Sequence, residues 1–109
     1  VSMAVNAFLW RASLDTVSFI PLDIVDPIGG VITTQWYEDT NNSSERIKLT
    51  IYVKDRRLRA DGISVNFFRE IKLEEGWAKA ETNPDTARLV EASILTKARE
   101  LRIGTLGSS

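Results

Sequence analysis

The sequence predicts an α+β domain of two layers, in which an antiparallel meander of three to five strands carries an N-terminal and a C-terminal helix on one face. Three observations support this class. Apolar residues recur at helical spacing near both ends of the chain, apolar and polar residues alternate strictly in the middle, and short links make neighbouring strands antiparallel. The 109 residues suit one domain, 1–109, with 1–3 and 104–109 expected to be frayed.

The first helix is expected within residues 4–19, which lack Pro and Gly. One apolar stripe is spaced alternately by four and three residues, and a weaker one lies beside it. The stronger stripe is Met3, Ala7, Trp10, Leu14 and Val17, and the weaker is Val5, Leu9 and Ala12. Pro21 ends this helix, because the residue before a proline is pushed out of the α region.

Two strands and a turn are expected next. Leu22–Asp26 is predicted as a short edge strand, and residues 26–30 as a Pro-Gly turn. Val31–Glu38 has strand composition, and its alternation places Trp36 on the face of Ile32 and Tyr37 on the opposite face. A polar loop, 39–44, is expected to follow.

The clearest strand signal lies at residues 46–54, where one apolar face alternates with a polar one. Its apolar residues are Ile47, Leu49, Ile51 and Val53. A further strand is predicted at 59–71, with Phe67 inward and Phe68 outward, and a turn at 74–76 leads to a short last strand at 77–80.

The second helix has a defined start. Asn83 can cap a free backbone amide, Pro84 suits the first helical position, and Asp85 meets the positive helix end. The predicted apolar stripe is Ala87, Val90, Ile94, Ala98 and Leu101. Glu91 is expected to be exposed, and Gly104 is predicted to end the helix.

Composition argues against catalysis. The chain has no His and no Cys, so it lacks the commonest general base, metal ligand and thiol nucleophile. We therefore predict no enzyme activity, no cofactor and no metal. Asp23, Asp26 and Asp39 could be read as a calcium site, but their spacing does not match an EF-hand and such positions favour Asp for turns. Gly29-Gly30 precedes a strand rather than a helix, which favours a turn over a phosphate loop.

The net charge of −1 and pI near 5.4 are unlike those of nucleic-acid-binding domains. One candidate partner surface consists of Tyr37, Tyr52 and Phe68, which alternation places on the outward sheet face. Cross-strand stacking without a partner is the alternative. A candidate contact for anions or lipid headgroups consists of Lys54, Arg56, Arg57 and Arg59, and a solvated hairpin end is the alternative. Trp10 and Trp36 are assigned to the core.

Two segments carry a family resemblance: the helix 8–14 around Trp10, and Gly29–Tyr37 with the sequence GGVITTQWY. With 59–61 and 94–98 they resemble an alphaproteobacterial family of envelope lipoproteins of unknown function, and this resemblance covers most of the chain. The layout is more distantly similar to the helix-grip domains of BamC, a lipoprotein of the outer-membrane assembly machine. The resemblance implies a periplasmic domain of an outer-membrane-anchored protein, with a signal peptide and a lipidated cysteine upstream, and membrane contact only through that anchor.

The leading hypothesis is a non-catalytic periplasmic interaction domain with an envelope protein partner, serving envelope or outer-membrane protein assembly. The alternative is a carrier of small apolar ligands, with a pocket between sheet and helices lined by Trp36, Ile51, Phe67 and Ile94. The sequence leaves the oligomeric state open.

Overall fold

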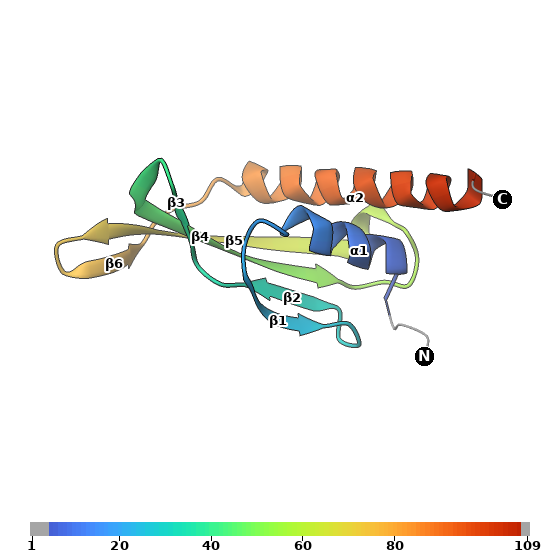
Figure 1. Ribbon diagram of the computed structural model, residues 1–109, viewed down its shortest axis with the longest axis horizontal. Coiled ribbons are helices and arrows are strands. Elements are labelled where there is room, and N and C mark those ends of the chain that lie inside the picture. Colours follow the sequence, from blue (N-terminus) through green and yellow to red (C-terminus); the bar gives the residue numbers. More distant parts are fainter. Residues whose placement is uncertain (1–4, 108–109) are drawn as a thin grey trace.

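The computed structural model describes residues 5–107 and has a helical layer on one face of an antiparallel sheet (Figure 1). Two helices form the helical layer, α1 (Ala7–Thr16) and α2 (Pro84–Gly107). The strands are β1 (Leu22–Asp26), β2 (Val31–Thr34), β3 (Tyr37–Asp39), β4 (Asn42–Val53), β5 (Ile63–Leu73) and β6 (Gly76–Lys79). The predicted α+β class is confirmed, with six strands rather than three to five.

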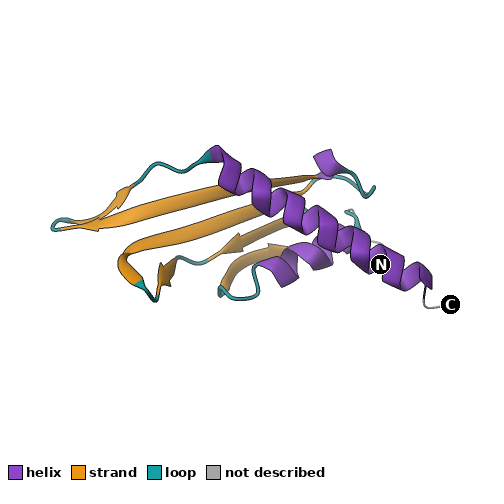
Figure 2. Cartoon of the chain, turned by 90° about the horizontal axis from the view of Figure 1, so that it is seen from above, coloured by secondary structure: helices purple, strands orange, loops and turns teal. Residues whose placement is uncertain are grey.

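The sheet has the strand order β1-β2-β4-β5-β6, and β3 pairs with the same strand, β4, as β2 does. Every pairing is antiparallel. The long hairpin of β4 and β5 forms the centre, and Figure 2 shows α2 crossing this hairpin obliquely with α1 beside α2. The predicted polar loop at 39–44 is wrong at Asp39 and from Asn42 onward, because β3 includes Asp39, and β4 begins at Asn42 and pairs with it.

The expected single strand Val31–Glu38 is divided by a one-residue bulge. Thr33 pairs with Thr50, and Tyr37 pairs with Ile47. Three residues separate Thr33 from Tyr37, whereas two separate their partners, so the side-chain alternation is shifted by one position. The Thr34 hydroxyl accepts a hydrogen bond from the Leu49 amide at 3.0 Å. This bond gives the Leu49 amide of β4 a partner where the regular strand pairing is interrupted.

α1 is shorter than the predicted range because Asn6 caps it. The Asn6 side chain accepts hydrogen bonds from the amides of Phe8 and Leu9, both at 3.0 Å. The stripe predicted to be weaker is the more buried one, since Leu9 and Ala12 are fully buried and Ala7 is exposed. α1 contacts both α2 and β4, so it buries two sides rather than one. Met3 lies outside the described residues.

α2 starts as predicted, with the Asn83 side chain accepting a hydrogen bond from the Asp85 amide at 3.0 Å. Ile94 and Ala98 on the predicted stripe are fully buried. The predicted exposure of Glu91 is wrong: it is half-buried, and its carboxylate accepts the Val65 amide at 2.8 Å. That contact supplies a partner for β5 where β6 no longer runs beside it.

The predicted helix end at Gly104 is wrong, because α2 continues to Gly107. The expected frayed tail is therefore helical over 104–107, while 1–3 and 108–109 lie outside the described residues. Thr105 and Leu106 can continue a helix, and Gly is permitted inside one at a modest cost.

This helix end can be tested by substituting Gly104 with alanine. No atom lies within 4 Å of the position that the new Cβ would occupy. The Gly104→Ala variant is expected to be more stable by up to about 1 kcal/mol, since alanine loses less conformational freedom in a helix. Urea denaturation followed by circular dichroism measures this difference. A loss of stability would mean that residue 104 caps the helix instead.

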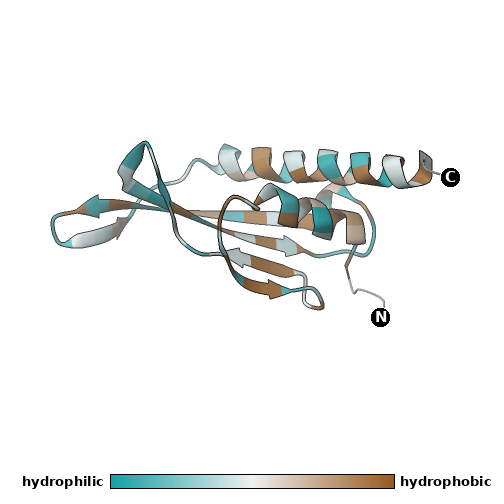
Figure 3. Ribbon diagram, viewed as in Figure 1, coloured by the Kyte–Doolittle hydropathy of each residue, from teal (hydrophilic) through white to brown (hydrophobic). Residues whose placement is uncertain are grey.

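The core lies between the helices and the apolar side of the sheet. Its fully buried members include Ile32, Ile51 and Ile94, which come from β2, β4 and α2. Figure 3 shows apolar and polar segments alternating along α2, as the helical spacing requires. Trp10 is 8% exposed, so its predicted core position is confirmed.

Candidate functional site

The face of the sheet opposite the helices, hereafter the outer face, carries no helix or strand from residues 5–107 (Figure 1). Residues paired across antiparallel strands point to the same side of the sheet. The register of β4 and β5 thus places one alternating set on the core side, and the other set on the outer face. The outer set is Arg46, Lys48, Thr50 and Tyr52 of β4, with Ser64, Asn66, Phe68 and Glu70 of β5.

Two tryptophans enclose an arginine on this face. The guanidinium carbon of Arg46 lies 4.7 Å from the ring centroid of Trp36 and 4.3 Å from that of Trp77. Its Nε donates to Glu70 Oε1 at 2.7 Å. Each cation–π contact of this kind contributes about 0.5–2 kcal/mol, depending on how far the charge is desolvated. The Trp36–Arg46–Trp77 stack is therefore a pre-organised aromatic surface.

Backbone register explains how these side chains meet. Arg46 is paired directly with Glu70 across β4 and β5. The two-residue turn after Leu73 pairs Lys72 with Trp77, which places Trp77 on the outer face. Trp36 reaches the same face because the bulge between β2 and β3 shifts the alternation.

Further cations surround the stack. The Nζ atoms of Lys48 and Lys72 lie 5.9 Å from the rings of Trp36 and Trp77, respectively. Because Glu70 already neutralises Arg46, these two lysines add positive charge at the border of the aromatic surface. This arrangement favours a partner that offers an apolar or aromatic group together with a carboxylate.

A hollow of about 260 Å³ adjoins the stack at the end of β6. It combines aromatic walls with a polar rim and is lined by Trp36, Phe67, Phe68, Arg69, Glu70, Lys79, Ala80 and Thr82. Glu70 is the one carboxylate that lines this hollow, and Lys79 and Arg69 are its cations.

The predicted outward orientation is confirmed for two of the three surface aromatics. Tyr52 is 38% exposed and Phe68 is 43% exposed. The prediction for Tyr37 is wrong, because the bulge turns it to the core side, opposite Ile47. There it meets Phe19 edge-on, with ring centroids 5.6 Å apart.

Trp36 shows the converse error. Its predicted core position is wrong, since it is half-buried on the outer face. The lining predicted for a carrier pocket is therefore divided between the two sides of the sheet. Trp36 lies on the outer face, whereas Ile51 and Ile94 are fully buried in the core on the other side. Periodicity alone did not single out Arg46 or Trp77. The two-residue hairpin turn was the signal that could have placed Trp77 outward.

The predicted basic cluster is partly neutralised by its own loop. Asp55 accepts hydrogen bonds from the Arg57 backbone and guanidinium, and Arg59 forms an ion pair with Asp61 at 2.9 Å. The hydrogen bond from the Arg57 side chain lowers the pKa of the Asp55 carboxyl. The pair therefore persists at neutral pH and is lost only as the pH falls through that lowered pKa. Lys54 and Arg56 remain exposed.

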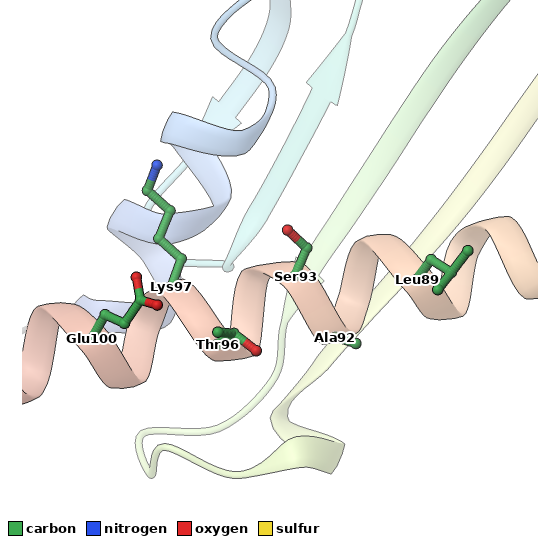
Figure 4. Close-up of a pocket in the computed structure, with 6 residues that line it drawn as sticks. All are labelled: Leu89, Ala92, Ser93, Thr96, Lys97 and Glu100. Atoms are coloured by element: carbon green, nitrogen blue, oxygen red, sulfur yellow. The ribbon is translucent and has the colours of Figure 1, made fainter.

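A second hollow, of about 530 Å³, lies along α2 and is lined by Leu89, Ala92, Ser93, Thr96, Lys97 and Glu100 (Figure 4). All six belong to one helix, and Lys97 extends to Asp15 of α1 with an Nζ–Oδ2 distance of 3.9 Å. This hollow is an open groove beside a helix. Among residues 5–107, no three acidic side chains gather in a way that could hold a metal ion. No helix in this described range is long and apolar enough to cross a membrane.

Comparison with known proteins gives two matches. The sequence model of a domain of unknown function, DUF3576, matches residues 3–103. An uncharacterized protein of Rickettsia prowazekii, RP420, is 41% identical over 106 residues, which cover 97% of this chain and 64% of that relative. The chain thus spans less than two thirds of the relative's length. No solved structure matches the chain.

Proposed function

This chain belongs to the DUF3576 family of domains of unknown function, and on that premise we propose that it is a non-catalytic interaction domain that binds an envelope protein through its outer face. The single observation that carries the proposal is the Trp36–Arg46–Trp77 stack on the sheet face opposite α1 and α2. The partner surface comprises this stack with Tyr52 and Phe68.

The chemistry of the stack favours a protein partner. Tryptophan, tyrosine and arginine are the residues most enriched among those that dominate binding energy at protein interfaces. Their rings and guanidinium are already held in place, so little side-chain entropy is lost on binding. Phe68 lies next to the stack, opposite Lys48, and Tyr52 lies further along β4 on the same face, beyond the Thr50–Asn66 pair.

We also propose that the full-length protein is a periplasmic lipoprotein anchored in the outer membrane and serving envelope or outer-membrane protein assembly. The support is the sequence resemblance at residues 8–14 and 29–37, to envelope lipoproteins and, more distantly, to BamC. Two helices on one face of an antiparallel sheet are compatible with a helix-grip layout.

The location is tested by metabolic labelling of the full-length protein with a fatty-acid analogue, followed by membrane fractionation. We expect label in the protein and recovery with the outer membrane. An unlabelled protein in the soluble fraction of the cytoplasm would overturn the location, and would leave the binding face to be tested separately.

The partner surface is tested by crosslinking and affinity capture of the full-length protein from membranes, comparing the wild type with a Trp36→Ala/Trp77→Ala variant. We expect an envelope protein to be captured by the wild type, and its affinity to fall roughly tenfold or more in the variant. Leu89→Ala is the matched control, since Leu89 is 70% exposed on α2 and away from the sheet. Equal capture by wild type and double variant would contradict the proposal.

The carrier of small apolar ligands is the second candidate, with its site moved to the hollow at the end of β6. Two of its four expected lining residues, Trp36 and Phe67, do line that hollow. However, its volume of about 260 Å³ is below the roughly 300–1,000 Å³ of typical ligand pockets, which favours the protein partner. Saturable binding of an apolar dye such as N-phenylnaphthylamine, lost on Trp36→Ala, would favour the carrier instead.

A further inference from the structure

The end of the molecule where α2 projects beyond the sheet carries a second surface, remote from the Trp36–Arg46–Trp77 stack (Figures 1 and 2). Here the last turns of α2 lie against the link between β4 and β5. A groove of about 380 Å³ marks this junction and is lined by Leu58 of the link and by Arg99, Arg102, Ile103 and Leu106 of α2. Residues far apart in sequence thus form one surface.

Large aliphatic side chains face water on this surface. Ile103 is 69% exposed and Leu106 is 68% exposed, while Leu58 is half-buried and packs against the core. Single exposed aliphatic residues are ordinary in soluble proteins. These two lie one turn apart on the projecting helix and share one groove, so they form a small apolar ridge.

Positive charge surrounds the ridge. Residues 54–61 and 99–106 together hold six Arg or Lys and three Asp or Glu, whereas the whole chain has a net charge of −1. Two of the three carboxylates form ion pairs within the link, Asp55 with Arg57 and Asp61 with Arg59. The charge that remains around the groove is therefore positive.

We propose that this end patch, defined as Leu58, Arg99, Arg102, Ile103 and Leu106, docks on an anionic phospholipid surface. The arginines would contact lipid phosphates while Ile103 and Leu106 enter the interfacial layer, the arrangement by which amphipathic helices hold to membranes. Arginine suits this position because its apolar stem follows the helix while its head reaches the phosphates.

A membrane fits this patch better than an acidic protein does. The patch lies at one end of an elongated molecule with extents of 57 × 24 × 22 Å, on the part of α2 that projects beyond the sheet (Figure 1). Contact with a lipid surface at this end needs no counterpart of a particular shape. The patch also differs from the expectation that the domain meets the membrane only through an anchor, and it is independent of the proposed outer-face partner.

The test is sedimentation of the 109-residue chain with vesicles of phosphatidylcholine containing about one-third phosphatidylglycerol, at about 50 mM NaCl. We expect binding to these vesicles and much weaker binding to pure phosphatidylcholine. Arg99→Gln/Arg102→Gln should lower the partition coefficient roughly 25-fold, since each cation near an anionic surface contributes about fivefold. Ile103→Ser/Leu106→Ser should also reduce binding.

Leu89→Ser is the matched control, because it also replaces an exposed aliphatic residue of α2 by serine but lies outside the patch. This variant should bind the vesicles as the wild type does. Circular dichroism of each variant checks that the fold is intact. Absence of wild-type binding, or binding that neither double variant weakens, would overturn the proposal. Loss of binding in the arginine variant alone, together with binding to polyglutamate, would overturn it in favour of an acidic protein.

Discussion

Replacing Ile94 with alanine is expected to lower the free energy of unfolding by about 2–5 kcal/mol. Ile94 is fully buried and belongs to the core between α2 and the sheet. The substitution removes three carbon atoms from a packed site and leaves a cavity that the neighbouring side chains fill only in part. Because a domain of this size is stable by only about 5–15 kcal/mol, the loss is a large fraction of the total.

Ile103→Ala is the matched control, since it makes the same chemical change on the same helix at a residue that is 69% exposed. Its effect should stay within about 0.5 kcal/mol. Both variants are measured by urea denaturation followed by tryptophan fluorescence, in which the buried Trp10 reports unfolding. Equal effects of the two substitutions would show that α2 does not pack on the sheet through Ile94.

Replacing Gly30 with alanine is expected to destabilise the domain by at least about 3 kcal/mol. Gly30 has φ +74°, and an added Cβ would lie 2.2 Å from the carbonyl oxygen of Val53 and 2.9 Å from Cγ1 of Val5. The first contact involves backbone of the central strand β4, which cannot move aside as a flexible side chain could. The Gly30 carbonyl also accepts the Val53 amide at 2.8 Å, so the strain falls on a pairing contact of the sheet.

Gly76→Ala separates the two causes of the lost stability, which are the positive φ angle and the close contact of the added Cβ. Gly76 has φ +127°, but no atom lies within 4 Å of the place that an added Cβ would take, so alanine there bears only the cost of the backbone conformation. That cost is expected to be about 1–3 kcal/mol. Thermal denaturation of both variants gives the comparison. If Gly76→Ala were the more damaging of the two, the close contact of Gly30 with β4 would be refuted.

Local signals in the sequence predicted most elements. Pro84 after the Asn83 cap marked the start of α2, and the alternation from Ile47 to Val53 marked the core side of β4. These features depend on a residue and its near neighbours: a cap satisfies an amide two residues away, and a strand alternates with period two whatever lies beside it. The same signals placed Tyr52 and Phe68 on the outer face.

The candidate site was only partly predictable, because a single bulge decides its composition. Without the extra residue between Thr33 and Tyr37, alternation would place Trp36 inward and Tyr37 outward, as the sequence alone suggested. No Gly or Pro marks residues 34–36, so the sequence had no turn signal there. The bulge exists because β4 pairs with two successive short strands, and that pairing is visible only in the sheet.

The sequence by itself determined that this chain is an α+β domain, which strand face is apolar, and where α2 begins. These follow from periodicity and capping, which act within a few residues. Only the tertiary structure decided that Trp36 and Trp77 enclose Arg46, and that Leu58 meets Arg99 and Ile103. Both surfaces join segments distant in sequence, and their geometry depends on strand register and helix length, which packing of the whole domain sets.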